Sequence, residues 1–363
     1  MKIINVAGAR PNFMKIAPLA AAFANFARIE SILVHTGQHY DERMSQTFFR
    51  QLAIGQPDVN LGVGSSSHAS QTAAIMKAFE PVVLRHKPTA VLVVGDVNST
   101  VACALVAAKL GVKVIHVEAG LRSFDKSMPE EINRILTDAI SDFLFCTEKS
   151  AVENLRREGA TDEKIFLVGN VMIDTLLAWK PKAEGSRILD SLNLDGQPYA
   201  VLTLHRPGNV DDAEVFSRLL DAIEVIQRDM PVIFPAHPRT RKDIVGLPLR
   251  RRIEGMANLR VIEPAGYLDF IKLMSRAAVV LTDSGGIQEE TTVLKVPCLT
   301  LRKNTERPVT CEVGSNVVVG TRPENIIAAY REAVSGRGRK PKRPPLWDGH
   351  AAERIAAILA ERL

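Results

Sequence analysis

Residues 278–294 read AVVLTDSGGIQEETTVL and place three patterns in a row. The apolar run Ala278–Thr282 predicts a buried strand, the paired glycines after it predict a tight turn, and Gly286–Leu294 predicts a helix. A strand that enters a helix through a glycine turn is half of a βαβ unit, the repeating element of a parallel sheet. This stretch therefore predicts an α/β fold.

The same alternation of strand and helix extends through the chain in both directions. In the first half, strands are predicted at Lys2–Ala7, Ser31–Thr36, Ala90–Gly95, Lys113–Val117, Phe143–Cys146 and Ile165–Val168. In the second half, they are predicted at Tyr199–Leu204, Pro231–Ala236, Leu259–Ile262, Ala278–Thr282, Cys298–Leu301 and Ser315–Val319. These runs are continuously apolar, as expected where helices cover both faces of a sheet.

Helices are predicted between these strands. In the first half they fall at Phe13–Phe26, Asp41–Gln51, Ala69–Lys87, Thr100–Leu110, Glu130–Ser141 and Lys149–Gly159. In the second half they fall at Ala213–Arg228, Leu268–Ser275, Gly286–Leu294 and Pro323–Ser335. Two such series predict two Rossmann-like, doubly wound domains that face a cleft, where the carboxyl ends of the strands bind a ligand.

The stretch Ala178–Pro198 holds two prolines and two glycines without a strong period, and we place the domain boundary there. A length of 363 residues also favours two domains, at roughly 150 residues each. We expect an N-terminal domain over residues 1–178 and a C-terminal domain over 199–345. An amphipathic helix within 346–363 is expected to pack back on the N-terminal domain.

The composition is that of a globular protein, with 46% hydrophobic and 24% charged residues. No run approaches the roughly 18 apolar residues of a membrane span, and the apolar run at Met1–Val6 is too short for a signal peptide. Four scattered cysteines without Cys-x-x-Cys spacing are typical of core residues in a reducing cytosol. We therefore expect a cytoplasmic protein without a membrane partner.

His35 and His39 are four residues apart, but the intervening Gly37 disfavours a helix that would bring them together on a metal ion. We therefore expect no metal site.

The net charge of +5 comes from 46 basic and 41 acidic residues that are interspersed along the chain. The one basic run, GRGRKPKRPP at residues 336–345, contains no aromatic residue for base stacking. It is interpreted as a linker rather than a nucleic-acid arm, and no nucleic-acid partner is expected. A small anion held by a few arginines accounts for the excess charge equally well.

Cations and carboxylates follow the strands of the first half. GARPNFMK (8–15) places Arg10 and Lys15 at a helix start, where they suit a phosphate, although Arg10 could also pair with a carboxylate. Asp96 in GDVNST, Glu118 in HVEAGLRS and Glu130 in MPEEINR are expected to converge on the cleft. Repulsion between neighbouring carboxylates raises the pKa of at least one of them, so that one can act as an acid and another as a base. The simpler alternatives are a helix-start role for Asp96 and a surface ion pair between Glu130 and Arg134 (residues 128–134).

The second half offers a nucleotide site. TLHRPGN places His205 and Arg206 after a strand, and PAHPRTR repeats this pattern with His237 and Arg239. The turn at residues 284–286 exposes helix amides to a phosphate, and a glutamate one turn later can accept hydrogen bonds from ribose hydroxyls. Residues 306–308 (Glu-Arg-Pro) add a cation. Dinucleotide binding is disfavoured because no Gly-x-Gly-x-x-Gly follows the first strand, and a Walker-type loop is absent.

Eight motifs in this order resemble the non-hydrolysing UDP-N-acetylglucosamine 2-epimerases, bacterial and archaeal enzymes of glycosyltransferase-B architecture, from Lys2 to about Leu363. They are GARPNFMK, HTGQHYDERMS, GDVNST, HVEAGLRS, MPEEINR, TLHRPGN, LTDSGGIQEE and TERP. The resemblance implies interconversion of UDP-N-acetylglucosamine and UDP-N-acetylmannosamine through elimination of UDP and its re-addition to a glycal. It also implies no nicotinamide or metal cofactor, a homodimer, and a supply of sugar nucleotide for cell-surface polysaccharide.

The resemblance also implies roles for individual residues. Asp96, Glu118 and Glu130 would share the acid and base work, and His205 would assist the diphosphate. The implied substrate-binding residues are Arg10, Lys15, Arg134, Phe270 at the uracil face, Ser284, Gly285 and Gly286 at the phosphate, Glu290 at the ribose, and Arg307.

Two features depart from the family pattern or widen it. Many members have a glutamate where this chain has Gly208, so any role of that side chain is open here. HTGQHYDERMS and INRILTD (132–138) also resemble a sister group that epimerises UDP-2,3-diacetamido-glucuronate. A UDP-sugar-dependent glycosyltransferase on the same plan and a UDP-sugar-binding sensor are the remaining alternatives.

Overall fold

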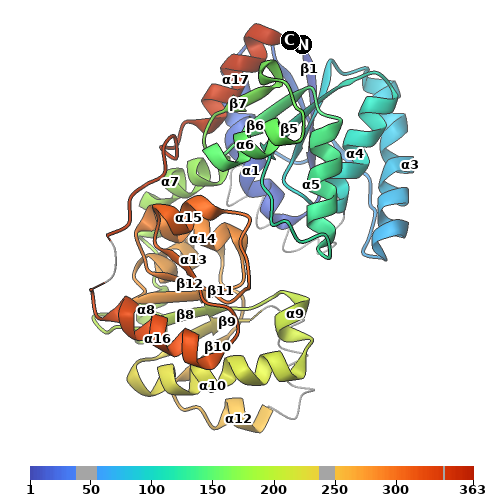
Figure 1. Cartoon of the computed structure of the whole chain (residues 1–363). Helices are drawn as coiled ribbons and strands as arrows, with labels where there is room; N and C mark the ends of the chain where they lie inside the picture. The colour runs from blue at the N-terminus through green and yellow to red at the C-terminus, as the bar shows by residue number, and fades with distance from the viewer. Residues whose placement is uncertain (38–54, 237–249, 338–339) are drawn as a thin grey trace. The chain divides into compact units, whose positions relative to one another are not determined.

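The structure is a computed structural model that describes residues 1–37, 55–236, 250–337 and 340–363. The chain divides into two compact units (Figure 1). The first unit is Met1–Thr175 together with Pro345–Leu363, and the second unit is Leu176–Pro344.

The first unit is built on a seven-stranded parallel sheet in the order β3-β2-β1-β4-β5-β6-β7. Its strands are β1 (Lys2–Ala7), β2 (Glu30–His35), β3 (Val59–Asn60), β4 (Ala90–Val94), β5 (Lys113–Ala119), β6 (Phe143–Cys146) and β7 (Ile165–Leu167). Its helices are α1 (Arg10–Ala24), α3 (His68–His86), α4 (Asn98–Lys109), α5 (Pro129–Ala139), α6 (Lys149–Arg157) and α17 (Ala351–Arg362), with a 3₁₀ turn, η1, at Asp162–Lys164. The strand order reverses between β1 and β4, and ligands of such sheets bind at this point.

The second unit repeats the plan with six parallel strands in the order β10-β9-β8-β11-β12-β13. These are β8 (Ala200–Thr203), β9 (Val232–Pro235), β10 (Leu259–Ile262), β11 (Val279–Thr282), β12 (Cys298–Thr300) and β13 (Asn316–Val318). The helices are α8 (Ile188–Ser191), α9 (Pro207–Val210), α10 (Ala213–Asp229), α12 (Arg250–Glu254), α13 (Tyr267–Ser275), α14 (Gly285–Leu294), α15 (Pro308–Glu312) and α16 (Pro323–Val334). Here the order reverses between β8 and β11.

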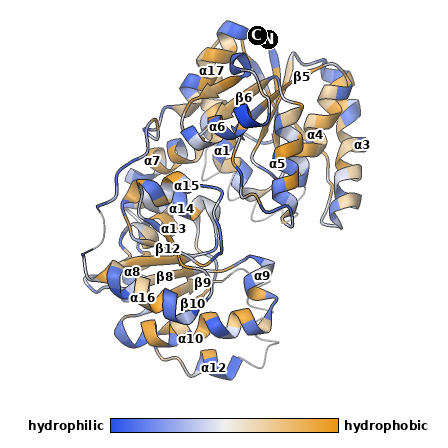
Figure 2. Ribbon diagram, viewed as in Figure 1, coloured by the Kyte–Doolittle hydropathy of each residue, from blue (hydrophilic) through white to orange (hydrophobic). Residues whose placement is uncertain are grey.

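Each sheet is covered by amphipathic helices. In the first unit, Phe79 and Val83 of α3 and the apolar face of α4 pack on β1, β2 and β4. In the second unit, α10 and α16 cover one face, where Phe216 and Tyr330 are almost fully buried. Figure 2 shows this pattern as helices that carry hydrophobic and hydrophilic residues side by side. The predicted α/β class with two Rossmann-like sheets is confirmed.

The last helix belongs to the first unit. Helix α17 packs against α1, and its first N–H groups, on Ala351 and Ala352, donate to the Asp174 carboxylate at 3.2 and 2.7 Å. Just before the helix, the Trp347 indole is fully buried and donates from Nε1 to the Thr147 carbonyl at 2.9 Å. The end of the chain is therefore fastened to the unit in which the chain begins.

The predicted elements agree with the structure within three residues at each end wherever they lie in the described part. The short helices α8, α9, α12 and α15 were not predicted, because four or five residues do not show a helical period. Strand β3 is too short to leave a periodic signal. The stretch Ala178–Pro198 was expected to be irregular, but α7 (Val171–Ala183) continues into it. Pro181 falls in the last turn of that helix, where it breaks the sequence pattern without ending the helix early. The helix predicted at Asp41–Gln51 lies outside the described residues.

Candidate functional site

The first unit gathers a lysine and a glutamate at the point where its strand order reverses. Lys15, in the second turn of α1, forms a buried ion pair with Glu118 near the end of β5. Gly95, directly after β4, makes room for this pair: a Cβ atom at Gly95 would lie 3.0 Å from Lys15 Nζ and 3.6 Å from Glu118 Oε2. Gly95 also has a φ of +68°, which favours glycine. The glycine of GDVNST is thus favoured by its backbone conformation, and a side chain there would press on the end of Lys15.

The backbone of Glu118 is strained. Its φ is +77°, and the pairing of β5 with β6 shifts register between Val117 and Ala119, so Glu118 occupies a bulge. A non-glycine residue in this region costs on the order of 1–3 kcal/mol and is typical of functional sites. The bulge interrupts the strand at the residue whose carboxylate reaches Lys15.

Asp96 is joined to α5 through a buried arginine. Arg134 pairs with Asp96 and also donates to Glu131, from Nε at 3.0 Å and from Nη2 at 2.7 Å. Glu131 in turn accepts the backbone N–H groups of Ser123 and Phe124 at 3.0 and 2.8 Å. Burial would raise the pKa of Glu131, but these hydrogen bonds and Arg134 hold it below its usual value.

Glu130 lies in the first turn of α5, where the helix dipole favours a carboxylate. Its side chain is partly exposed, and within the part of the chain that the structure describes it forms no ion pair. The alternative of a surface pair between Glu130 and Arg134 is therefore wrong, because Arg134 is turned to Asp96 and Glu131. Asp96 does not initiate α4 either, since that helix begins at Asn98 after Val97.

The second unit centres on Asp283, the residue directly after β11, whose carboxylate is fully buried. It accepts the backbone N–H groups of His205 and Arg206 at 3.1 and 3.0 Å, the Asn209 amide at 3.1 Å, and lies 2.7 Å from His205 Nδ1. Burial would raise the pKa of Asp283, but its hydrogen bonds with His205 and these N–H groups hold it below its usual value. The His205 side chain remains 54% exposed, so the ring is oriented by a buried carboxylate while one edge faces outward.

Three arginines of the second unit meet at Glu306. This carboxylate contacts Arg302 at 2.8 Å, Arg307 at 2.6 Å and Arg206 at 3.7 Å, and Arg307 also reaches Glu289 at 2.5 Å. Burial alone would raise the pKa of Glu306, but the surrounding guanidinium groups hold it far below its usual range. The five side chains carry three positive and two negative charges, and this excess suits an anion.

The glycine turn and its helix lie beside this cluster. A Cβ atom at Gly285 would come within 2.5 Å of Arg307 Nη1, so glycine is required there by the arginine. Ser284 precedes the first turn of α14, whose N-terminal N–H groups favour an anion. Further along α14, Glu290 is buried and accepts a hydrogen bond from the Tyr267 hydroxyl at 3.2 Å. Burial raises the pKa of Glu290 to about 8.

The remaining candidates are placed as follows. Phe270 on α13 is partly buried and packs against the cluster that contains Tyr199. Arg10 begins α1, but its side chain lies outside the described part, as do His39, His237 and Arg239. No group of three or more His, Cys, Asp or Glu side chains among the described residues is arranged to hold a metal ion. None of the described helices is long and apolar enough to cross a membrane.

Sequence reasoning missed three buried residues that organise these clusters: Glu131, Asp283 and Glu306. All of them lie inside the quoted motifs, and this position is the only feature of the sequence that could have identified them. Their partners are distant in the sequence, so no local pattern identifies them.

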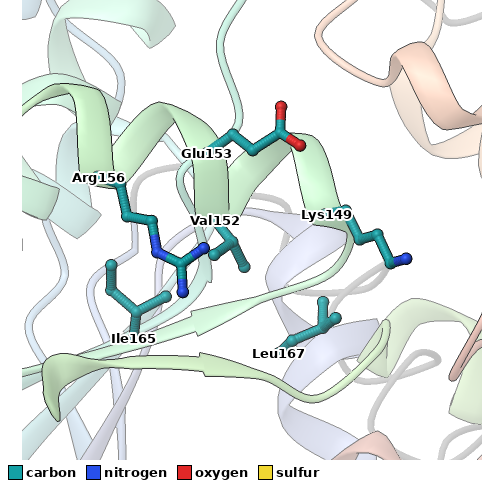
Figure 3. A pocket seen from close by; sticks show the side chains of 6 residues that line it. All are labelled: Lys149, Val152, Glu153, Arg156, Ile165 and Leu167. Atoms are coloured by element: carbon teal, nitrogen blue, oxygen red, sulfur yellow. The ribbon is translucent and has the colours of Figure 1, made fainter. Parts of the chain in front are cut away.

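A groove on the surface of the first unit has a volume of about 350 Å³ (Figure 3). It is lined by Lys149, Val152, Glu153 and Arg156 of α6 and by Ile165 and Leu167 of β7. It shares no residue with the polar clusters described above, and Arg156 is engaged with Asp162 at 2.7 Å.

Comparison with known proteins gives a consistent result. A family profile described as UDP-N-acetylglucosamine 2-epimerase matches residues 21–360. A UDP-N-acetylglucosamine 2-epimerase of Methanocaldococcus jannaschii is 44% identical over 365 residues, which cover 99% of each chain. A UDP-2,3-diacetamido-2,3-dideoxy-D-glucuronate 2-epimerase of Pseudomonas aeruginosa is 42% identical over 366 residues, covering 99% of this chain and 100% of the relative.

Among solved structures, the crystal structure of the Methanocaldococcus jannaschii UDP-GlcNAc 2-epimerase in complex with UDP-GlcNAc and UDP matches with a TM-score of 0.93. The identity is 42%, and the match covers 99% of this chain and 100% of that one.

Proposed function

The chain belongs to the UDP-N-acetylglucosamine 2-epimerase family, and we propose that it interconverts UDP-N-acetylglucosamine and UDP-N-acetylmannosamine. One observation carries the proposal: two carboxylates lie at the carboxyl ends of the neighbouring strands β4 and β5, Asp96 just after β4 and Glu118 in the bulge near the end of β5, and each is paired with a buried cation. A reaction that removes a proton from an unactivated carbon needs such positioned acid and base groups. Simple binding of a UDP-sugar does not.

The proposed reaction begins at carbon 2 of the sugar. A carboxylate of the group Asp96, Glu118 and Glu130 takes the proton, and the bond between carbon 1 and the diphosphate breaks. The products are a glycal and bound UDP. UDP then adds back to carbon 1 while a proton reaches carbon 2 from the opposite face, so the atoms balance without any other reactant. Lys15 and Arg134 hold the carboxylates of Glu118 and Asp96 in place.

The second unit is proposed to hold the nucleotide. The N–H groups at Ser284, Gly285 and Gly286, with Arg307 beside them, suit the diphosphate, which becomes more negative as it leaves. His205, oriented by Asp283, can donate a proton or hydrogen bond to that group. Glu290 is assigned to the ribose, Phe270 to the uracil face, and Arg10 to a further phosphate contact.

The experiment is an incubation of the purified protein with UDP-N-acetylglucosamine in deuterated water, followed by proton NMR. The manno isomer, with deuterium at carbon 2, is the expected product. Folded protein that forms no isomer and exchanges no hydrogen, with either this substrate or UDP-2,3-diacetamido-glucuronate, would refute the proposal.

The diacetamido-glucuronate substrate is the second candidate, because the Pseudomonas aeruginosa relative named for it is 42% identical to this chain, against 44% for the Methanocaldococcus jannaschii UDP-N-acetylglucosamine 2-epimerase. Parallel assays with both sugar nucleotides under the same conditions decide between the two substrates through kcat/KM.

Two other functions predict different results. A glycosyltransferase would release UDP only when an acceptor is present. A sensor would bind the nucleotide but tolerate loss of the carboxylates.

We also propose a homodimer that works in the cytoplasm. Ile132 and Leu136 support the dimer, since they are exposed one turn apart on α5. The free cysteines, of which three are buried, suit a reducing compartment. Sedimentation equilibrium gives the mass in solution, and a monomer at micromolar concentration would contradict the dimer.

A further inference from the structure

A buried ion pair lies beneath the carboxylate-bearing loops of the first unit and takes no part in the chemistry proposed above. His116, in the middle of β5, has no exposed surface, and Asp138, in the last turn of α5, is also buried. His116 Nδ1 and Asp138 Oδ1 are 2.6 Å apart.

The other polar atoms of this pair bind the backbone of both loops. His116 Nε2 donates to the carbonyl of Gly95 at 2.9 Å, and Asp138 Oδ2 accepts the N–H of Gly120 at 3.0 Å. Gly95 directly precedes Asp96, and Gly120 follows Glu118 by two residues. Asp138 also shares α5 with Glu130, so the pair connects all three segments that carry a candidate carboxylate.

The chemistry of these contacts sets which atoms donate and which accept. The Gly95 carbonyl can only accept a hydrogen bond, so His116 Nε2 must be the donor, and a hydrogen is shared between His116 Nδ1 and Asp138 Oδ1. Arg122 Nη2 lies 2.7 Å from Asp138 Oδ2 and is itself held by Glu158 at 2.5 Å. Burial would raise the pKa of Asp138, but His116 and Arg122 hold it below its usual value. The result is a hydrogen-bonded network of His116, Asp138, Arg122 and Glu158.

We propose that His116 and Asp138 are positioning residues that hold the peptides at Gly95 and Gly120, and through them the carboxylates of Asp96 and Glu118. The strained backbone of Glu118 persists only where its surroundings enforce it, and the hydrogen bond to Gly120 is made just beyond the bulge. The backbone strain at Glu118 is consistent with a positioning role, because a displacement of about 1 Å in a catalytic group reduces turnover about 100-fold. This inference rests on the proposed function for its catalytic consequence.

Substitutions of both residues test the inference. We expect Asp138→Asn to lower kcat about 100-fold while KM for the sugar nucleotide stays within about threefold, because the nucleotide contacts lie elsewhere. His116→Gln, whose side-chain amide can still donate to the Gly95 carbonyl, is expected to retain more activity than His116→Leu. Equal kcat in His116→Gln and His116→Leu, or kcat in Asp138→Asn within about threefold of the wild-type value, would overturn the proposal.

Asp174→Asn is the matched control. Asp174 is likewise a buried carboxylate of the first unit that accepts two backbone N–H groups, but it serves the start of α17. We expect this variant to lower the melting temperature of the protein with little change in kcat. If the Asp174→Asn and Asp138→Asn variants have the same melting temperature and also lose the same amount of kcat, the loss follows from reduced stability, and the His116–Asp138 pair has only a structural role.

Amide hydrogen exchange separates this inference from the proposed function. In Asp138→Ala, the Gly120 N–H is expected to exchange faster than in the wild type, and in Asp174→Asn it is not. This measurement requires no substrate, so it decides the positioning role even if the wild-type protein shows no epimerase activity. Unchanged exchange at Gly120 in Asp138→Ala overturns the proposal.

Discussion

Each candidate carboxylate has a different environment. Glu118 is buried against Lys15, Asp96 is partly exposed against Arg134, and Glu130 stands partly exposed at the start of a helix. Because the three environments differ, the groups can take different parts in a reaction that removes a proton on one face of the sugar and delivers one on the other.

Neutral replacement of each carboxylate tests its role. Asp96→Asn, Glu118→Gln and Glu130→Gln are each expected to lower kcat by about 100-fold or more, the range expected for loss of a general acid or base. Turnover and deuterium incorporation at carbon 2 are measured together by NMR. Glu153→Gln, an exposed change on α6, is the control and is expected to leave kcat unchanged. Near-normal turnover in any one of the three variants removes that residue from the catalytic set.

The raised pKa of Glu290 leads us to expect that binding of the sugar nucleotide depends on pH. Because its pKa in the folded protein is about 8, the carboxylate is largely protonated at pH 6.5 and ionised at pH 8.5. If only the ionised form accepts the ribose hydroxyls, the affinity for UDP-N-acetylglucosamine rises about 25-fold over this range. Calorimetry of wild type and Glu290→Gln measures it, and the variant is expected to show a smaller slope. Equal slopes would show that Glu290 does not contact the nucleotide in its charged form.

The same shift has the opposite effect on stability. The unfolded pKa of a glutamate is about 4.3, so between this value and about 8 the folded state holds a proton at Glu290 that the unfolded state has lost. The contribution of this group to the free energy of unfolding is therefore full below about pH 4 and declines as pH rises towards 8.

At the level of elements, short glycine turns decide how closely side chains approach. The turn into α14 has no space for a Cβ atom at Gly285, because Arg307 and Glu306 fill it. The turn after β4 is similar, with Gly95 against Lys15 and Glu118. In both units the glycine follows a central strand, where parallel strands end together and a ligand can reach the backbone.

Gly285→Ala is expected to displace Arg307 and weaken UDP binding about tenfold or more, since overpacking costs about 1–3 kcal/mol. Gly208→Ala is the matched control in the same unit, because a Cβ atom there has no neighbour within 4 Å among the described residues. Titration calorimetry with UDP compares the two. Unchanged affinity in Gly285→Ala would show that Arg307 does not contribute to nucleotide binding.

At the level of the whole molecule, the chain starts and ends in the same unit. Trp347 and α17 return to the first unit after the second unit is complete, and the indole buries itself against the segment at Thr147. The first unit therefore cannot complete its core until the last residues are available. Its stability depends on residues at both ends of the sequence.

Trp347→Ala is expected to lower the free energy of unfolding of the first unit by about 3–5 kcal/mol, the cost of removing a buried aromatic side chain. Trp179→Ala is the comparison, because the Trp179 side chain is only partly buried and contacts Lys182 at 3.9 Å. It should cost less. Urea denaturation followed by circular dichroism measures both, and equal losses would contradict a special role for the C-terminal segment.

Much of this protein is determined by local sequence. Apolar runs of four to six residues and helical periods depend on neighbours within one or two turns, so most of the strands, the longer helices other than α7 and the two-sheet α/β class followed from the sequence. The same holds for the motifs at strand ends, because parallel strands always present their carboxyl ends on one edge. This is why Asp96, Glu118, His205 and Ser284 could be selected as candidates.

Only the tertiary structure decided which of these side chains meet. Lys15 and Glu118 are 103 residues apart, and Arg134 rather than Glu130 is the partner of Asp96. The sheet order β1-β4-β5 creates both contacts, and no local pattern encodes a distance across that order. The strained backbone of Glu118 and the His116–Asp138 pair below it were decided in the same way, because burial and long-range hydrogen bonding, not local preference, stabilise them.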